Sequence, residues 1–497
     1  MPDSDRGAGE AGGTTEYDVI VLGGGPAGEN AADYAIAGSD RTAAIVEPEK
    51  VGGECSYWAC IPSKALLRPG HVLGAALGLP GIEASGPDIA AVLRRRDEFV
   101  HAHHGDHDDS SQVEWAAGKG IEVIRGTGRL DGERRVRVGD RTLRARVAVV
   151  LATGTRAAVP DVPGLRAALP WTSRDATNLH EVPNRVVVIG GGVVACEAAT
   201  WLSALGAEVT VLVRGERLLA GVEPFAGEYI ASALTAQGVQ ILFGTQPQRV
   251  SRPDAAAHGE GRIHGGAVTV HAQGPGGATT LVADEIVVAA GRVPNTAGIG
   301  LETVGLETGY VPVDDQLTVS GVDGEWLYAV GDINHRAALT HMGKYQGRVC
   351  GDVISARAEG RSLSGPRYRA CADHYAVPQV VFTDPEVAAV GRTATAARAA
   401  GYDIRTVELD IAVAGSALAR DDYMGRAALV IDNATDTLLG ATFVGPEVGE
   451  QLHAATIAVA GRVPLDALWH AVPAFPSISE FWLRLLETDR SSLPSQV

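Results

Sequence analysis

The feature that most constrains the fold is a glycine-rich turn between a strand and a helix, which occurs twice in the chain. The first copy, Gly23-x-Gly25-x-x-Gly28, lies between an apolar run at residues 17–22 and a helical pattern at residues 27–37. A short apolar run bounded by glycine predicts a buried strand, and the order strand, turn, helix predicts the start of a βαβ unit.

The three glycines of this turn have separate roles. Gly23 permits the tight turn, Gly25 lets the backbone approach a pyrophosphate, and Gly28 allows the helix to pack closely on the strand. The N-terminus of the helix attracts the anion. A second strand at residues 43–46 leads to Glu47, whose carboxylate suits a ribose hydroxyl. The segment therefore predicts a dinucleotide site.

The second copy repeats this order far downstream. It consists of a strand at residues 185–189, the turn Gly190-x-Gly192-x-x-Ala195, a helix at 193–205 and a strand at 208–213. The pattern tolerates alanine at its third position. Two separate βαβ units predict two dinucleotide sites.

The residue that corresponds to Glu47 in the second copy is Arg214, and Arg217 lies three residues further on. No carboxylate stands there to meet a ribose hydroxyl, whereas two guanidinium groups suit a 2′-phosphate. We therefore expect NADPH at the second site, with NADH still possible if both arginines are only solvated.

Two cysteines, Cys55 and Cys60, are separated by four residues and can form a disulfide across one bent turn. Pro62 favours the first turn of a helix, which would place Cys60 at a helix N-terminus, where the dipole favours a thiolate. A metal site would need further ligands, and no local C-x-x-C or histidine partner accompanies the pair. The remaining cysteines are scattered and are expected to be ordinary thiols: Cys196, Cys350 and Cys371.

Composition excludes several classes of protein. A length of 497 residues suggests about three domains, and a net charge of −18 argues against nucleic acid and anionic membranes as partners.

The start of the chain, residues 1–15, is polar and is expected to be a disordered tail without signal-peptide character. The longest apolar stretch, residues 186–205, contains glycines and Glu197. We therefore expect a cytoplasmic protein without a membrane span. The His- and Asp-rich run at residues 101–109 is expected to be solvated rather than metal-binding.

Together these motifs resemble the pyridine nucleotide–disulfide oxidoreductase family, whose members include dihydrolipoamide dehydrogenase, glutathione reductase and mercuric reductase. The resemblance extends from about Tyr17 to Leu486. It is carried by several separated motifs: Gly52-Gly53-x-Cys55-(four residues)-Cys60-x-Pro62-Ser63-Lys64, Ala152-Thr153-Gly154, Ala290-Gly291-Arg292-x-Pro294-Asn295, Ala329-x-Gly331-Asp332, and the segment from Val377 to Glu386.

The resemblance implies an α/β fold with two doubly wound Rossmann-like nucleotide-binding domains and a C-terminal α+β dimerisation domain. The FAD-binding domain would comprise residues 16–155 and 285–365, the NAD(P)H-binding domain residues 156–284, and the dimerisation domain residues 366–497. It also implies a homodimer in which each active site is shared between subunits.

The resemblance further implies the roles of individual residues. NADPH would reduce FAD, and reduced FAD would open a disulfide between Cys60, nearer the flavin, and Cys55, the outer thiol that attacks a substrate. Lys64 would pair with Glu197 close to the flavin. The expected FAD contacts are Gly23, Gly25, Gly28, Glu47, Gly154 and Asp332, and the expected NADPH contacts are Gly190, Gly192, Ala195, Arg214, Arg217 and Gly291.

The chain departs from the family pattern at its C-terminal motif, His-Pro-(three residues)-Glu. Glu480 is present, but Phe475 stands in place of the histidine that moves protons to and from the thiols. Loss of a general acid–base typically costs roughly 10²–10⁴-fold in rate, so an ordinary disulfide acceptor is in doubt. His470 is a candidate substitute at the wrong position. Mercury reduction is not expected, because the chain lacks the C-terminal cysteine pair of mercuric reductases.

A second departure lies between the cysteines, where Tyr57 and Trp58 are bulkier than usual. They either pack in the core or shape a pocket for an apolar substrate. The leading function is reduction of a disulfide or related small-molecule acceptor by NAD(P)H, through FAD and the cysteine pair. The alternatives are a quinone, metal-ion or dye reductase, a dithiol oxidase with reversed electron flow, and a non-enzymatic assembly subunit. Intact Cys55, Cys60, Lys64 and Glu197 argue against the last.

Overall fold

The computed structural model describes residues 14–103 and 106–492. The expected tail lies outside the described residues, except for Thr14 and Thr15, which begin the first strand. The chain divides into two compact units. Unit 1 consists of Met1–Tyr57, His101–Arg156 and Arg292–Asp373, and unit 2 consists of Trp58–Val100, Ala157–Gly291 and His374–Val497.

Unit 1 is built on a parallel sheet. Strand β1 (Thr14–Leu22) pairs with β2 (Ala43–Glu47) on one side and β8 (Arg141–Leu151) on the other, β2 pairs with β5 (Ile121–Arg125), and β18 (Leu327–Ala329) pairs with β8. All five residues of β2 are buried. Burial on both faces explains why β2 and the last four residues of β1 are almost entirely apolar. Antiparallel strands β6 (Gly128–Leu130) and β7 (Arg135–Val138) extend the sheet beyond β8.

Two helices of unit 1, α1 (Pro26–Ile36) and α9 (Thr340–Ala358), pack closely against each other. Glycine makes this approach possible. A Cβ at Gly347 would lie 2.5 Å from the carbonyl oxygen of Ala27, and one at Gly351 would lie 2.5 Å from the Cβ of Tyr34. The helix that comes after the first glycine turn is therefore held from its other side by α9.

Unit 2 contains a second parallel sheet in the order β12-β11-β10-β16. Its strands are β10 (Arg185–Ile189), β11 (Glu208–Val213), β12 (Gln240–Phe243) and β16 (Glu285–Val288). Helices α7 (Val193–Ala204) and α8 (Pro224–Ala236) pack against this sheet. A separate antiparallel sheet consists of β13 (Gln246–Ser251), β14 (Val268–Gly274) and β15 (Gly277–Ala283), in which β14 pairs with both of the others.

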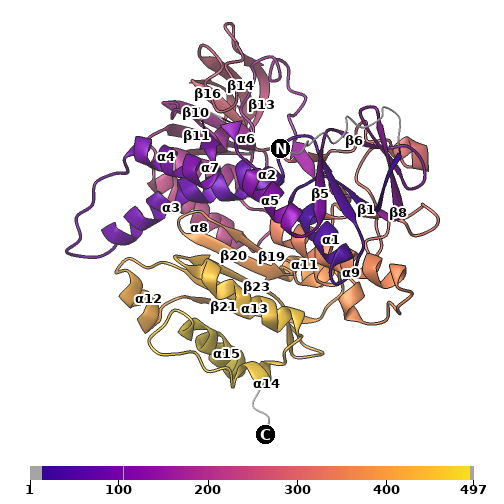
Figure 1. Ribbon diagram of the computed structural model, residues 1–497. Coiled ribbons are helices and arrows are strands. Elements are labelled where there is room, and N and C mark those ends of the chain that lie inside the picture. The colour runs from indigo at the N-terminus through magenta and orange to yellow at the C-terminus, as the bar shows by residue number, and fades with distance from the viewer. Residues whose placement is uncertain (1–13, 104–105, 493–497) are drawn as a thin grey trace, which may run out of the picture. The chain divides into compact units, whose positions relative to one another are not determined.

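The C-terminal part of unit 2 is an antiparallel sheet in the order β19-β20-β23-β22-β21. Its strands are β19 (Pro378–Val381), β20 (Glu386–Gly391), β21 (Ile404–Asp410), β22 (Arg426–Asp432) and β23 (Thr437–Gly445). Helices α13 (Leu452–Ala460) and α15 (Glu480–Ser492) contact this sheet (Figure 1, yellow). It is the α+β segment that the sequence predicts.

The elements that carry the cysteines are α2 (Gly53–Tyr57) in unit 1 and α3 (Cys60–Leu77) in unit 2. Helices α3 and α7 contact each other along unit 2. The remaining helices are α4 (Ile89–Phe99), α5 (Ser110–Gly118), α6 (Ser173–Thr177), α10 (Ala372–Tyr375), α11 (Ala394–Ala399), α12 (Ala414–Ala419) and α14 (Leu465–Leu468). The short strands are β3 (Ala102–His103), β4 (Asp106–His107), β9 (Thr155–Ala157) and β17 (Arg292–Pro294), and the 3₁₀ turns are η1 (Leu301–Val304), η2 (Gly331–Asn334), η3 (Pro366–Tyr368) and η4 (Val448–Gln451).

The fold is thus α/β, with two nucleotide-type parallel sheets and a C-terminal α+β segment. Over residues 14–103 and 106–492, the chain contains no helix that is both long and apolar enough to span a bilayer. Residues 58–100, which include α3, belong to unit 2, and one boundary between the units falls between Tyr57 and Trp58. The three expected domains and their bounds stay a prediction.

Candidate active site

The first glycine turn needs glycine at two of its three positions, and the third has open space beside it. Gly23 has φ +108°, and a Cβ there would lie 2.3 Å from the carbonyl oxygen of Ala152. A Cβ at Gly28 would lie 2.0 Å from the carbonyl oxygen of Gly23. At Gly25, with φ −75°, the nearest atom would be 4.0 Å away. Neither conformation nor packing demands glycine at Gly25, so the open backbone there fits the close approach of a phosphate group.

Glu47 ends β2 beside this turn and is 8% exposed. Its two carboxylate oxygens accept the N–H groups of Gly24 at 2.7 Å and Glu49 at 2.8 Å. Burial raises the pKa of Glu47, although both N–H groups act in the opposite direction. Each carboxylate oxygen can accept a second hydrogen bond, so the side chain fits a ribose hydroxyl donor.

Asp332 lies in η2 and accepts the hydroxyl of Thr155 at 2.8 Å. Arg292 holds the same hydroxyl, with its Nε 2.5 Å from Thr155 Oγ1 and 3.8 Å from Asp332 Oδ2. Its other arm pairs with Glu54 in α2 at 3.0 Å. The sequence predicted no role for Thr155, Arg292 or Glu54, although Arg292 belongs to one of the family motifs and Glu54 precedes Cys55.

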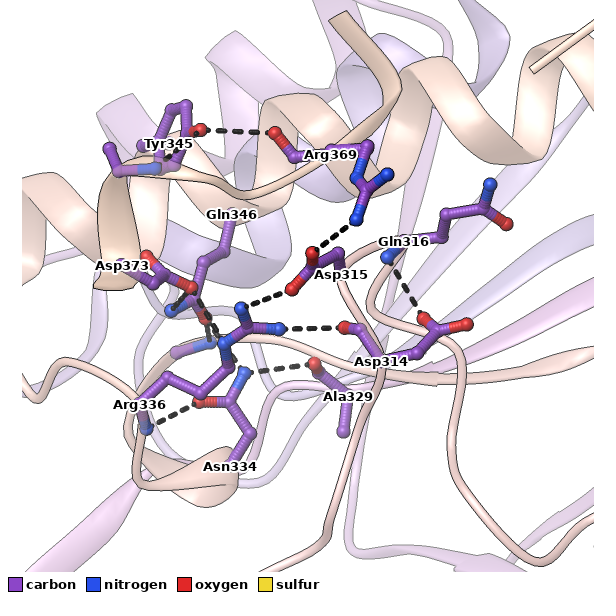
Figure 2. A network of polar contacts seen from close by, with 12 residues as sticks. Asp314, Asp315, Gln316, Ala329, Asn334, Arg336, Tyr345, Gln346, Arg369 and Asp373 are labelled. Atoms are coloured by element: carbon purple, nitrogen blue, oxygen red, sulfur yellow. Dashed lines mark hydrogen bonds and ion pairs between the residues drawn. The ribbon is translucent and has the colours of Figure 1, made fainter. Parts of the chain in front are cut away.

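A buried polar network holds the turn that carries Asp332 (Figure 2). The amide oxygen of Gln346, on α9, accepts the N–H of Gly331 and the side-chain amide of Asn334, both at 2.8 Å. Its amide nitrogen donates to Asp373 at 3.0 Å. Arg336 pairs with the same Asp373 at 3.1 Å and with Asp315 at 2.8 Å. Because Gln346 is fully buried, these contacts fix the backbone on both sides of Asp332.

Two further glycines of the expected FAD and NADPH sites have left-handed backbone. Gly154 has φ +66°, and Gly291 has φ +123°. A Cβ would meet no described protein atom within 4 Å at either residue. Conformation alone therefore explains glycine at both positions, and both leave open backbone next to the glycine turns of their own units.

The cysteine pair spans the end of one helix and the start of the next. Cys55 lies in α2 and Cys60 is the first residue of α3, and both are partly buried. The residue before Cys60, Ala59, caps α3 without a side-chain hydrogen bond. By contrast, Cys196 is buried in α7, where burial raises the pKa of its thiol to about 12, and burial also raises the pKa of the Cys350 thiol. These two thiols stay protonated at neutral pH, so they are poor nucleophiles.

The fold brings Lys64 and Glu197 into contact within unit 2. The ammonium group of Lys64 lies 2.8 and 3.0 Å from the two carboxylate oxygens of Glu197, which is 4% exposed. The backbone N–H of Phe382 donates to the same carboxylate at 2.9 Å. The centre of the Phe382 ring lies 4.8 Å from the Lys64 ammonium. Helices α3 and α7 thus hold a partly buried charge pair one helical turn beyond Cys60.

The second glycine turn resembles the first at its first two positions. Gly190 has φ +142°, and a Cβ there would lie 2.3 Å from the carbonyl oxygen of Ala289, whereas Gly192 has open space around its Cβ position. Ala195 is fully buried in the core. Arg214, just beyond β11, is exposed, and Arg217 is half-buried and donates to the carbonyl of Ala220 at 2.9 Å. Both guanidinium groups therefore remain accessible at the end of β11.

The two residues of the C-terminal motif, Phe475 and Glu480, differ in their exposure to solvent. Phe475 is 74% exposed. Glu480 begins α15, is 8% exposed, and pairs with Arg484 through Oε1 at 2.7 Å. Its Oε2 is buried without a hydrogen-bond partner in the described chain. His470 is exposed.

Tyr57 and Trp58 are 2% and 5% exposed. Of the two interpretations of these residues, burial favours core packing over the lining of an open pocket. Among the described residues, no group of three or more His, Cys, Asp or Glu side chains could hold a metal ion. The expectation that the run at residues 101–109 binds no metal remains a prediction, since residues 104–105 lie outside the described part.

Comparisons with known proteins agree with this geometry. The family model of the pyridine nucleotide-disulphide oxidoreductases matches residues 17–347, and the model of the dimerisation domain of the same family matches residues 377–485. The chain therefore belongs to the pyridine nucleotide-disulphide oxidoreductase family. It is an enzyme of the flavoprotein disulfide oxidoreductase class, whose members use FAD and NAD(P)H, and its dimerisation domain supports a homodimer.

Several relatives cover almost the whole chain. A mercuric reductase of Staphylococcus aureus is 29% identical over 472 residues, which are 94% of this chain and 81% of that protein. Dihydrolipoyl dehydrogenase 3 of Pseudomonas aeruginosa is 33% identical over 477 residues, 93% of this chain and 96% of that protein. Among solved structures, the Cu(II) complex of the HOCl-induced flavoprotein disulfide reductase RclA from Escherichia coli matches with a TM-score of 0.78 and 25% identity, covering 95% of this chain and 99% of that one.

Proposed function

We propose that this protein is an NADPH-dependent reductase that passes electrons through FAD and a Cys55–Cys60 disulfide to a small disulfide or a related acceptor. The observation that carries the proposal is the Lys64–Glu197 pair at 2.8 Å, one helical turn beyond Cys60. A fixed charge pair of this kind is the electrostatic support that a redox centre beside Cys60 requires. The open backbone at Gly25 and Gly192 adds two places where a dinucleotide phosphate fits.

FAD, when bound, supplies a group that accepts a hydride from NADPH and passes two electrons on. The chain itself performs the thiol steps. The thiolate of Cys55 attacks one sulfur of the acceptor disulfide and releases the first thiol product. Cys60 then attacks the sulfur of Cys55, so that the Cys55–Cys60 disulfide re-forms and the second thiol product leaves. Overall, one NADPH and one proton reduce one disulfide to two thiols.

On this proposal, residues of unit 1 hold FAD: Gly23, Gly25, Gly28, Glu47, Gly154 and Asp332. Residues of unit 2 hold the nicotinamide nucleotide: Gly190, Gly192, Ala195, Arg214, Arg217 and Gly291. The exposed guanidinium of Arg214 supports NADPH over NADH, because it can meet a 2′-phosphate. We further propose a homodimer with shared active sites, in a cytoplasmic setting.

A second candidate function rests on Phe475. Its side chain is apolar and 74% exposed, where the family motif carries a proton-transferring histidine. Such a site suits an acceptor whose reduction releases no thiolate that must be protonated. A quinone, a metal ion or a dye meets that requirement, and an apolar ring also suits a planar apolar acceptor. Glu480 keeps its place in the motif and would serve as the remaining acidic group.

Steady-state turnover of the FAD-loaded dimer with NADPH tests the proposal. For a disulfide acceptor, Cys55→Ser and Cys60→Ser should each lower kcat/KM by at least about 100-fold, and Cys371→Ser, a partly buried cysteine outside the pair, should match the wild type. Full disulfide activity in Cys55→Ser would contradict the thiol route. Quinone turnover that survives Cys55→Ser while disulfide turnover is negligible in every variant would favour the second function.

A further inference from the structure

Trp58, between the two cysteines, is anchored by three contacts within unit 2. Its indole N–H donates to the carboxylate of Glu260 at 2.8 Å. The guanidinium of Arg174 lies 4.1 Å from the centre of its ring. Its backbone carbonyl accepts the hydroxyl of Thr177 at 3.0 Å. A 5% exposed side chain held at its ring face, its N–H and its backbone has little freedom to move.

The loop that supplies Glu260 is itself held in place. Asn178 donates to the same Glu260 oxygen at 3.1 Å. The N–H of Gly261 points to Asp175 at 3.3 Å, and its carbonyl accepts the N–H of His180 at 3.0 Å. Gly261 has φ +69°, and a Cβ there would lie 2.1 Å from the carbonyl oxygen of Asn178. Only glycine allows this approach, so the loop is seated tightly on the C-terminal end of α6.

The end of α6 is fixed from its other side by Arg96 of α4. The guanidinium of Arg96 is almost completely buried and donates to the backbone carbonyls of Thr177 and Leu179. Thr177 in turn holds the backbone of Trp58. Burying a guanidinium is costly unless it is hydrogen-bonded. Arg96 therefore makes α6 and the segment after it a rigid base for the residues that precede α3.

The residues that precede α3 lead directly to Cys60. Trp58 is followed by Ala59, the N-cap of α3, which offers no side-chain hydrogen bond to the first turn. The position of Cys60 at the start of α3 therefore depends on the backbone before it. Thiolate reactivity depends on such N–H groups and on the helix dipole.

We propose that Trp58, together with Glu260 and Arg174, is a positioning residue for Cys60. The indole anchor holds the backbone before α3 so that the sulfur of Cys60 faces the first turn of the helix. Loss of the anchor lets Cys60 turn away and makes its thiolate harder to form. This inference rests on the proposed function, in which Cys60 is one of the two working thiols.

The test measures each thiol separately in the reduced, FAD-loaded protein. Alkylation by iodoacetamide is followed over a series of pH values, and mass spectrometry of the peptides gives the rates for Cys55 and Cys60. Trp58→Phe keeps an aromatic ring, although a smaller one, and removes the N–H bond to Glu260. It should shift the pH midpoint for Cys60 upward by about one unit, which lowers its rate near neutral pH by about tenfold. The rate for Cys55 should change by less than about twofold.

Two variants at Glu260 extend the test. Glu260→Ala removes the acceptor and should reproduce the Cys60 shift of Trp58→Phe, whereas Glu260→Gln keeps an acceptor oxygen and should stay within about threefold of the wild type. If Trp58→Phe does not yield folded protein, Glu260→Ala carries the same comparison without altering the aromatic side chain.

Trp171→Phe is the matched control. Trp171 is another buried tryptophan of unit 2, and its indole N–H donates at 2.8 Å to the carbonyl of Arg262, in the same loop as Glu260. The substitution should lower Tm without moving the alkylation profile of Cys60. Equal Cys60 profiles in Trp58→Phe and Trp171→Phe would overturn the proposal. Disulfide turnover retained in Cys60→Ser would instead contradict the proposed function, and it leaves the alkylation comparison readable.

Discussion

The two glycine-rich turns, at residues 23–28 and 190–195, differ at their third small residue. In the first turn, a Cβ at Gly28 would lie 2.0 Å from the carbonyl oxygen of Gly23. In the second, Ala195 carries that Cβ and is fully buried in the core. The second helix therefore stands far enough from its turn to admit a methyl group. The same sequence pattern thus permits two packing distances, and the tighter one tolerates no substitution.

The residue after this position differs as well: Glu29 in the first turn is partly buried, and Cys196 in the second is fully buried. In the first turn it is Glu29, whose Oε1 has no hydrogen-bond partner in the described chain, and burial raises its pKa to about 7. In the second turn it is Cys196, whose pKa is raised to about 12. The first turn therefore contains a group that titrates near neutral pH, whereas the second does not.

The largest expected effect comes from exchanging the third residues. Gly28→Ala places a methyl group against a backbone oxygen that cannot move, so it should destabilise the fold by about 3 kcal/mol or more. Ala195→Gly only removes a methyl group and adds backbone freedom, so it should cost about 1 kcal/mol. Thermal and denaturant unfolding measure both. Equal losses in the two variants would contradict the difference in packing distance.

The next effect concerns Glu29. Its folded pKa, about 7, lies above the ordinary value of 4.5, so the folded state holds the proton more tightly than the unfolded state. Stability should therefore fall as pH rises from about 4.5 to 7 and stay level above that. Glu29→Gln should remove this loss and stabilise the protein at pH 8 by up to about 3 kcal/mol.

Unfolding at several pH values checks this expectation. Cys196→Ser, at the matching position of the second turn, should show no change in pH dependence between pH 4.5 and 8, because its thiol stays neutral throughout. An equal change in stability between pH 4.5 and 7 in the wild type and in Glu29→Gln would show that Glu29 does not carry the effect.

A smaller effect is expected at the middle glycines, where a Cβ meets no close protein atom. Gly25→Ala should weaken FAD binding and Gly192→Ala should weaken NADPH binding, each by about 10- to 100-fold, with little change in Tm of the nucleotide-free chain. Flavin content after dialysis and KM for NADPH measure the two. If both variants lose stability and retain their nucleotides, packing rather than ligand approach selects these glycines.

The smallest effect concerns the charged residue at the end of the second strand of each βαβ unit, Glu47 in the first and Arg214 in the second. Arg214→Ala should raise KM for NADPH by about tenfold and leave KM for NADH unchanged, because it removes one charge-assisted bond to a 2′-phosphate. Arg217→Ala should act in the same direction. Higher kcat/KM with NADH than with NADPH in the wild type would contradict the role of both arginines.

Local patterns in the sequence were enough to predict the first two strands and the glycine turn of each βαβ unit. The runs at residues 185–189 and 208–213 are Val-rich segments bounded by turn residues, and β10 and β11 have those bounds. The Lys64–Glu197 contact was predicted from family resemblance, since the two residues are 133 positions apart. Their pairing depends on the packing of α3 against α7, which no local pattern encodes.

The contacts that the sequence did not predict join residues far apart in the chain. Trp58 reaches Glu260 across 202 positions, and Arg292 reaches Glu54 across 238. Glu260 lies in a Gly- and His-rich stretch that resembles an ordinary loop. Its role becomes visible only once Gly261 is seen against Asn178. The boundary between Tyr57 and Trp58 is equally hard to find from sequence, because the chain crosses between units inside a motif that has the pattern of one local segment.

Anaerobic titration of the purified FAD-loaded protein with NADPH, followed by absorbance, tests the central claim most directly. If Cys55 and Cys60 form a redox disulfide coupled to FAD, the protein should take up two electrons while most of the oxidised flavin absorbance remains, with a new long-wavelength band from a thiolate beside the flavin. Cys60→Ser should lack that band. Immediate bleaching of the flavin by the first equivalent of NADPH, without the band, would contradict the claim and would place electron exit at the flavin itself.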